Sequence, residues 1–145
     1  MIGFLQRARG ASVEVDGECI GRIGDGLLVL VGVRREDGEA NARRLAQRLL
    51  GYRVFADDDG RMNRSLADTG GGLLLVPQFS LAADTRRGTR AGFSPAAEPR
   101  RAEVLFEQLV THCRAAHGAV ECGRFGADMQ VALVNDGPVS FWLEG

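Results

Sequence analysis

The segment Ala11-Ser12-Val13-Glu14-Val15-Asp16-Gly17 decides the fold class. Apolar and polar residues alternate up to Val15, as they do in a strand that buries one face. Asp16-Gly17 is a strong signal for a two-residue hairpin turn, because both turn positions need backbone angles that suit Asp and Gly. The segment therefore predicts antiparallel strands over residues 11–15 and 18–23.

Further strands are predicted on both sides of this hairpin. Two continuous apolar runs, at residues 27–33 and 73–76, are typical of strands buried on both faces. The other predicted strands cover residues 2–8, 52–55 and 129–134.

Two helices interrupt the strands. Apolar residues recur at helical spacing over residues 39–50 and 99–116. Asp37 is the expected N-cap of the first helix and Gly51 its stop, while Pro99 suits the first turn of the second helix. Residues 61–72 are expected to be irregular. Together these patterns predict one α+β domain over residues 1–145, with a mainly antiparallel, β-barrel-like sheet and two principal helices packed outside it.

Composition excludes several functional classes. The net charge is −1, so the chain lacks the overall basic charge of many nucleic-acid-binding proteins. All 18 basic residues are Arg, and without Lys the chain can form neither a Schiff base nor a Walker-type phosphate loop. The three cysteines lack zinc or disulfide spacing. No apolar segment approaches the ~20 residues of a membrane span, and residues 1–7 have too short an apolar run and too early a charge to be expected as a signal peptide. We expect a soluble cytoplasmic protein without metal, cofactor or membrane contact.

Side chains for standard catalysis are scarce. The only histidines, His112 and His117, lie on or at the end of the second predicted helix, where an interaction with the helix end explains them. There is no nucleophile elbow and no His-plus-carboxylate metal motif. The acidic turn Asp57-Asp58-Asp59-Gly60 could hold a metal, but a solvated turn is the simpler interpretation. An enzyme built from this sequence must rely on its backbone.

Three polar stretches remain as candidate sites. Gln78-Phe79-Ser80 follows a buried strand, where it either caps the strand end or holds a developing oxyanion. Asn135-Asp136-Gly137-Pro138 is either a hairpin turn or a rigid backbone device that contacts a ligand, since Gly-Pro reaches unusual backbone geometries. The loop with Arg86, Arg87 and Arg90 is either solvated or contacts phosphate, with Arg100 and Arg101 in support.

Short motifs follow one another in a characteristic order along the whole chain. They are Gln6-Arg7, Ala11-Ser12-Val13, Gly24 with Gly26-Leu27-Leu28-Val29, Leu50-Gly51-Tyr52-Arg53-Val54-Phe55, Met62-Asn63, Gln78-Phe79-Ser80-Leu81-Ala82-Ala83-Asp84, Gly123-Arg124-Phe125-Gly126-Ala127-Asp128-Met129 and Asn135-Asp136-Gly137-Pro138-Val139. With these motifs the chain resembles the D-aminoacyl-tRNA deacylases of the bacterial and eukaryotic type. The resemblance implies a homodimer that hydrolyses the ester bond of D-aminoacyl-tRNA at a site in the subunit interface, without a cofactor.

The resemblance also implies residue roles. The family's Ser-Gln-x-Thr motif matches positions 77–80, so Gln78, Phe79 and Ser80 are the expected catalytic segment. A Gly-cis-Pro motif matches Gly137-Pro138, which would enter the partner's pocket and exclude L-amino acids while accepting D-amino acids and glycine, including glycine mischarged on tRNA(Ala). Three residues would line the pocket and a fourth would brace the Gly-Pro segment. These are Ala102, Phe125 and Met129 for the pocket, and Arg7 for the brace.

Two positions depart from the family pattern. Pro77 stands where Ser is usual, which removes a hydroxyl and a backbone N–H, and Ser80 stands where Thr is usual. We still expect activity, with the Ser80 hydroxyl positioning groups rather than acting as a nucleophile. The alternatives are a non-catalytic RNA-binding module, which would need exposed stacking aromatics, and a general esterase, which would need the missing triad.

Overall fold

The predicted hairpin is the longest antiparallel feature of the computed structural model, which describes residues 1–145. Strand β1 (Ile2–Val15) pairs with β2 (Glu18–Gly32) over almost its whole length. Asp16 and Gly17 have φ angles of 51° and 77°, the positive values that a two-residue turn of this kind needs. The hairpin prediction is confirmed, and the runs predicted as separate strands merge into two long ones.

Most residue pairs of the sheet are antiparallel, as expected, but two of its strand pairings are parallel and the barrel-like arrangement is not confirmed. Its strand order is β6-β5-β2-β1-β7, with β5 (Gly72–Pro77), β6 (Val120–Cys122) and β7 (Gln130–Glu144). β7 is antiparallel to β1, but β5 is parallel to β2 and β6 is parallel to β5. Parallel neighbours need a long crossover, and the two helices supply it. The edge strands β6 and β7 do not pair with each other, so the expected barrel-like sheet does not close.

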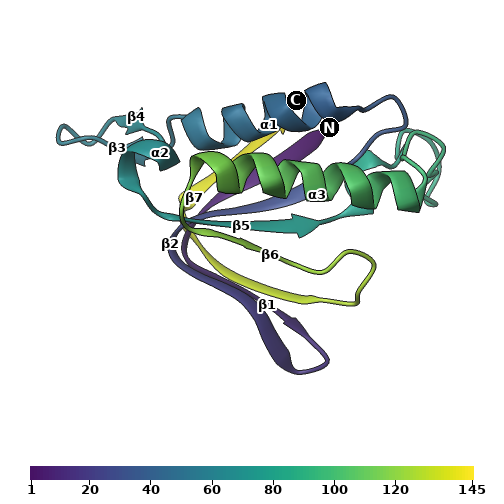
Figure 1. Ribbon diagram of the computed structural model, residues 1–145, viewed down its shortest axis with the longest axis horizontal. Helices are drawn as coiled ribbons and strands as arrows, with labels where there is room; N and C mark the ends of the chain where they lie inside the picture. The colour runs from purple at the N-terminus through teal and green to yellow at the C-terminus, as the bar shows by residue number, and fades with distance from the viewer.

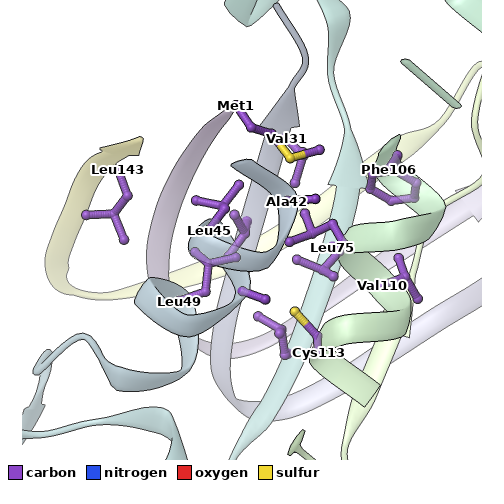
Figure 2. Close-up of a cluster of buried hydrophobic side chains, with 14 of the residues drawn as sticks. Met1, Val31, Ala42, Leu45, Leu49, Leu75, Phe106, Val110, Cys113 and Leu143 are labelled. Atoms are coloured by element: carbon purple, nitrogen blue, oxygen red, sulfur yellow. The ribbon is translucent and has the colours of Figure 1, made fainter. Parts of the chain in front are cut away.

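Helices α1 (Glu39–Gly51) and α3 (Pro99–Ala116) lie side by side on one face of the sheet (Figure 1). Their apolar stripes are buried as predicted, and they pack with strand residues in the main core (Figure 2). The N-cap of α1 is Gly38 rather than Asp37. Asp37 is instead buried, where its carboxylate accepts bonds from the amino group of Met1 and the backbone N–H of Arg34.

The apolar runs in β2 and β5 are buried on both faces, as predicted. Leu73 and Leu75 belong to the core under the helices, whereas Leu74 and Val76 belong to a second apolar cluster. Neighbouring strand residues point to opposite faces, so the second cluster lies on the other side of the sheet. It contains Ala8, Ala11, Val13, Ile23, Leu28, Leu74 and Val76.

The segment between α1 and β5 has more regular structure than expected. β3 (Phe55–Ala56) pairs with β4 (Met62–Arg64), and α2 (Leu66–Thr69) follows with Ser65 as its N-cap. The strand predicted over residues 52–55 is therefore reduced to its last residue. In the acidic turn, the Asp57 carboxylate accepts bonds from Asn63 and from two backbone N–H groups, and Asp58 pairs with Arg64. None of the helices is long and apolar enough to cross a membrane.

The cysteine thiols differ sharply in burial, which gives a testable expectation. Burial in α3 raises the pKa of the Cys113 thiol to about 12, whereas Cys19 is exposed on β2. Because the thiolate is the reactive form, we expect Cys19 to react with Ellman's reagent at pH 8 and Cys113 to stay protected until the protein is denatured. A variant with Cys19→Ser and Cys122→Ser isolates Cys113. Rapid labelling of that native variant would contradict the buried placement.

Candidate active site

Gln78, Phe79 and Ser80 lie where β5 ends and a short 3-10 helix, η1 (Phe79–Ala82), begins. The backbone N–H of Gln78 donates to the carbonyl of Val31 at 2.7 Å and fixes the start of this turn. Gly32 lets η1 approach the sheet, because a Cβ there would lie 2.9 Å from Cβ of Leu81. As the first residues of a helix, Phe79 and Ser80 have N–H groups without an intrahelical acceptor. The turn therefore presents backbone donors at the surface.

The Ser80 hydroxyl has an amide for a neighbour and no base. Gln78 Nε2 donates to Ser80 Oγ, and this is the side-chain bond that the hydroxyl makes. Neither histidine is close. His117 Nε2 lies 2.6 Å from the carbonyl oxygen of Gly71, the residue before the first residue of β5, whereas Ser80 follows the last. His112 Nε2 lies 3.8 Å from the Glu39 carboxylate. An activated serine needs an adjacent base, so this arrangement favours a positioning role for the hydroxyl.

Met129 and Phe125 reach the same end of β5 through the loop that follows β6. The backbone N–H of Gly123 donates to the carbonyl of Leu75, and a Cβ on Gly123 would lie 2.8 Å from Sδ of Met129 and 3.4 Å from Cδ of Pro77. Met129 packs against the second apolar cluster, whereas Phe125 packs against the core under the helices. The loop thus wraps around the end of β5.

Ala102 is buried in the first turns of α3, close to the end of β2. The neighbouring Arg101 donates to the carbonyl of Asp37 at 2.7 Å, and the backbone N–H of Ala97 donates to Val33 at 3.0 Å. The predicted catalytic segment and all three predicted pocket residues therefore belong to segments at one end of the sheet.

Gly137 and Pro138 form a bulge inside one strand, which corrects the hairpin-turn interpretation. The apolar runs on both sides pair with the same strand, β1. Gln6 and Ala8 on β1 pair with Ser140 and Asn135 on β7. The two β1 residues are 2 positions apart and their β7 partners are 5 positions apart, so β7 has 3 extra residues here, and these form the bulge. Gly137 has a φ of 143°, and the peptide bond between Gly137 and Pro138 is cis.

Side chains hold this bulge from both sides. Arg7 Nε donates to the carbonyl of Asp136 at 2.9 Å, and Arg7 Nη1 donates to the carbonyl of Val54 at 2.7 Å. On the other side, Asn135 Oδ1 accepts from the N–H of Val139 at 2.8 Å and Asn135 Nδ2 donates to Ser140 Oγ at 3.0 Å. Arg7 therefore lies where a brace for the Gly-Pro segment is expected, and Asn135, which belongs to the same motif but had no predicted role, is a second support.

The bulge and the Ser80 turn are far apart within one chain. β2 and β1 lie between β5 and β7, so three strand spacings separate the two segments laterally, about 14 Å. Pro77 pairs with Val31, which in turn pairs with Gly3 on β1. The bulge begins beside Arg7, four residues further along β1, so the two segments are also about 13 Å apart along the strand direction. The direct separation is thus roughly 20 Å. One chain alone does not bring the two predicted site segments together.

The outer edge of β7 is open and apolar. β7 pairs only with β1, and Val131, Val134 and Trp142 are exposed along it. An unpaired edge strand with exposed apolar side chains tends to associate with another chain. This edge includes the bulge.

The arginine loop, residues 84–92, is closed by backbone hydrogen bonds between its two ends, and the carboxylate at its first residue is paired with an arginine. The backbones of Asp84 and Gly92 exchange two hydrogen bonds, of 2.7 and 2.9 Å. Arg86 makes a two-pronged contact with the Asp84 carboxylate, at 2.9 and 2.8 Å, and these hydrogen bonds hold the pKa of Asp84 well below its usual range. Arg87 and Arg90 form no ion pair. Of the three predicted phosphate contacts, Arg86 is therefore already paired, and two cations remain free.

Comparison with known proteins decides the family. The sequence profile described as D-Tyr-tRNA(Tyr) deacylase matches residues 4–144. A protein of Alkalilimnicola ehrlichii named D-aminoacyl-tRNA deacylase is 65% identical over 99% of this chain and 96% of its own length. The protein of the same name from Thioalkalivibrio sulfidiphilus is 62% identical over 99% of this chain and 97% of its own length.

This chain belongs to the D-aminoacyl-tRNA deacylase family. Its family is one of hydrolases that act on the ester bond of aminoacyl-tRNA. Among solved structures, the c-Myc DNA Unwinding Element Binding Protein is 34% identical, covers 100% of this chain and 99% of its own, and superimposes with a TM-score of 0.95. A probable eukaryotic D-amino acid tRNA deacylase has the same fold, with a TM-score of 0.85 at 17% identity over 99% of this chain and 98% of its own.

One exposed aromatic residue of this deacylase-family chain escaped the sequence reasoning. Phe93 follows the arginine loop, and its ring centroid lies 5.2 Å from that of Phe79. Aromatic residues are normally assigned to the core, and Phe93 lies outside any periodic pattern that would place it there. The available signal was its position in Gly92-Phe93-Ser94, between small residues with no strand or helix pattern.

Proposed function

We propose that this chain hydrolyses the ester that joins a D-amino acid to the terminal ribose of tRNA, and leaves L-aminoacyl-tRNA intact. The full-length match to relatives named D-aminoacyl-tRNA deacylase carries the proposal. The site is compatible with this reaction, because the Ser80 turn offers backbone donors for an oxyanion, although it contains no acid–base pair. Aminoacyl esters are activated, so positioning and oxyanion stabilisation suffice for their hydrolysis. A substrate of this kind is consistent with work in the cytoplasm.

The proposed reaction uses water as the nucleophile. Water attacks the acyl carbon, and the N–H groups of Phe79 and Ser80 stabilise the oxyanion that forms. The tetrahedral intermediate then collapses, the ribose oxygen leaves and takes up a proton, and the free D-amino acid is released. The 2′-hydroxyl of the ribose positions the water, while the Gln78 amide orients the Ser80 hydroxyl at the edge of the site.

The proposed chiral screen comes from a second copy of the chain. In a homodimer, Gly137 and Pro138 of one subunit would enter the other subunit's site and crowd the position of an L side chain. The separation of roughly 20 Å within one chain supports this arrangement, because two subunits are needed to bring both segments together. The open apolar edge of β7 supports association. Glycine has no side chain to exclude, so glycyl-tRNA(Ala) would also be hydrolysed.

Hydrolysis of D-Tyr-tRNA and L-Tyr-tRNA by the purified protein tests the proposal directly. Loss of the acid-precipitable amino acid is followed under single-turnover conditions with each substrate. We expect rapid loss of D-Tyr and no loss of L-Tyr above the spontaneous rate. Equal rates for the two substrates would overturn the proposal.

Ser80→Ala separates the two roles of the hydroxyl. Without an adjacent base the hydroxyl only positions groups, so we expect kcat/KM for D-Tyr-tRNA to fall less than about tenfold, a smaller loss than removal of an oxyanion donor causes. Single-turnover rates give this number, and thermal unfolding of the variant checks its fold. A loss of several orders of magnitude with normal stability would assign the hydroxyl a nucleophilic role.

A further inference from the structure

Two aromatic rings stand in water beside the proposed site. Phe79 is 64% exposed and Phe93 is 46% exposed. Their centroids lie 5.2 Å apart with an angle of 44° between the rings, so they contact each other while much of each side chain stays exposed. Exposed aromatic side chains that form one patch mark a binding surface more often than isolated ones do.

The arginine loop holds this patch next to two free cations. Phe93 directly follows Gly92, whose backbone bonds to Asp84 close the loop. The loop between β5 and α3 gathers at the end of the sheet where β5 terminates (Figure 1). Arg87 and Arg90 lie on this loop without an ion pair, while Arg86 is paired with Asp84. Aromatic rings and unpaired guanidinium groups therefore occur on one braced segment.

We propose that Phe79 and Phe93 stack on an unpaired nucleobase at the 3′ end of tRNA, and that Arg87 and Arg90 bind the phosphates that flank it. This inference rests on the proposed function and names its nucleotide subsite. Stacking of a base on an aromatic side chain changes affinity by roughly tenfold or more when the ring is removed. Arginine suits the adjacent phosphates, because its planar guanidinium donates two parallel hydrogen bonds.

Charge favours RNA over a second copy of the chain on this patch. The centres of protein–protein interfaces are depleted in charged groups, whereas Arg87 and Arg90 line the same hollow as Gly92 and Ser94, the two neighbours of Phe93 in the chain. A two-fold contact through the patch would also place four uncompensated guanidinium groups, two from each copy, in one interface. A nucleotide supplies a flat base that can stack on the rings and a negative charge that can pair with the arginines.

A stacking subsite would also suit an enzyme whose D-amino acid substrates are attached to many different tRNAs. Stacking depends on the face of the base and reads its identity weakly. Phosphate contacts carry no sequence information either. The subsite would therefore bind the unpaired 3′ end that tRNAs share, and leave the rest of the tRNA free to vary.

Variants of Phe93 test the inference, because its ring has no place in the proposed chemistry. We expect Phe93→Ala and Phe93→Leu to raise KM for D-Tyr-tRNA about tenfold with kcat nearly unchanged, and Phe93→Tyr to restore the wild-type KM. The loss in Phe93→Leu separates stacking from simple apolar packing. With D-tyrosyl-adenosine as substrate, a parallel rise in KM identifies the terminal adenine as the stacked base, and a rise confined to tRNA identifies a preceding one.

The arginines are tested by Arg87→Gln/Arg90→Gln, with Arg44→Gln on α1 as a matched exposed control. The double variant should raise KM for D-Tyr-tRNA, flatten its dependence on salt and leave D-tyrosyl-adenosine unaffected, because only tRNA carries the flanking phosphates. Arg44→Gln should change none of these.

Several outcomes would overturn the inference. If the wild type prefers D-Tyr-tRNA but Phe93→Ala keeps the wild-type KM, the stacking subsite is wrong and the proposed function stands. If Phe93→Ala dissociates the protein in sedimentation experiments, the patch is a subunit interface. If the wild type shows no D-preference, the proposed function fails, and the anisotropy of a labelled CCA-ending RNA oligonucleotide, wild type against Phe93→Ala, decides on the subsite alone.

Discussion

Gly26→Ala should destabilise this protein by at least about 3 kcal/mol, at the upper end of the usual effect of overpacking. β2 and β5 run parallel here with Gly26 opposite Gly72. A Cβ on Gly26 would lie 1.9 Å from the carbonyl oxygen of Gly72 and 2.7 Å from its nitrogen. These are backbone atoms, so no side-chain rotation relieves the overlap. The methyl group would have to push the start of β5 away from β2 and break the parallel pairing.

Urea unfolding and thermal unfolding measure this effect. A loss of 3 kcal/mol corresponds to a fall in Tm of about 10 °C for a domain of this size. Gly24→Ala is the matched control, since Gly24 lies on the same strand and a Cβ there meets nothing within 4 Å. A Gly26→Ala variant that unfolds at the same urea concentration as Gly24→Ala would contradict the close approach of the two strands.

Gly137→Ala is expected to lower the ratio of D-Tyr-tRNA to L-Tyr-tRNA hydrolysis at least tenfold. The φ of 143° disfavours any residue with a Cβ, and the added atom would lie 2.7 Å from Cγ2 of Val139 and 3.3 Å from Nη2 of Arg7. The bulge must therefore shift against the side chains that hold it. A displacement of about 1 Å can change a rate by two orders of magnitude, and here it would open the space that the proposed screen denies to an L side chain.

Single-turnover rates on the two substrates give the ratio, with Gly118→Ala as a control because a Cβ there has no neighbour within 4 Å. Mixing tests whether the screen acts on the partner. An excess of Ser80→Trp subunits, with a blocked Ser80 turn and an intact bulge, should suppress L-Tyr-tRNA hydrolysis by Gly137→Ala subunits after exchange. Unchanged L-hydrolysis in mixed dimers would place the screen in its own subunit.

The local elements of the fold follow from the sequence, but the pairing of strands distant in the chain does not. Asp16-Gly17 and the stripe on α3 depend on neighbouring residues, so their patterns are visible in the chain. Whether β5 joins β2 in parallel depends on how α1 packs across the sheet, and hairpin signals elsewhere favoured the wrong answer. The helix between two fully apolar runs was the better indication, since such runs separated by a helix are typical of parallel pairing.

The candidate site was identified from motifs, and its geometry needed the structure. Gln78, Ser80 and Gly137 lie in stretches that the residue pattern already singled out. Their roles came from the resemblance, because those roles depend on backbone geometry that residue type alone does not reveal. The distance between the two segments follows from strand order and register, which no local pattern encodes. The pairing of Arg86 with Asp84, two residues apart, and the contact between Phe79 and Phe93 depend on how the loop closes.

The pairing of β1 with β7 has a consequence for the order of events during synthesis. Ile2 lies opposite Glu144, so the first strand of this sheet receives its second neighbour from the strand made last, β7. Contacts between residues so distant in the chain form slowly, because a long loop must close first. A ribosome-bound chain can form the β1–β2 hairpin early, but it carries an open edge on β1 until β7 has emerged. Chaperones that protect unpaired strands should therefore engage this protein before β7 emerges and leave it once β7 has paired with β1.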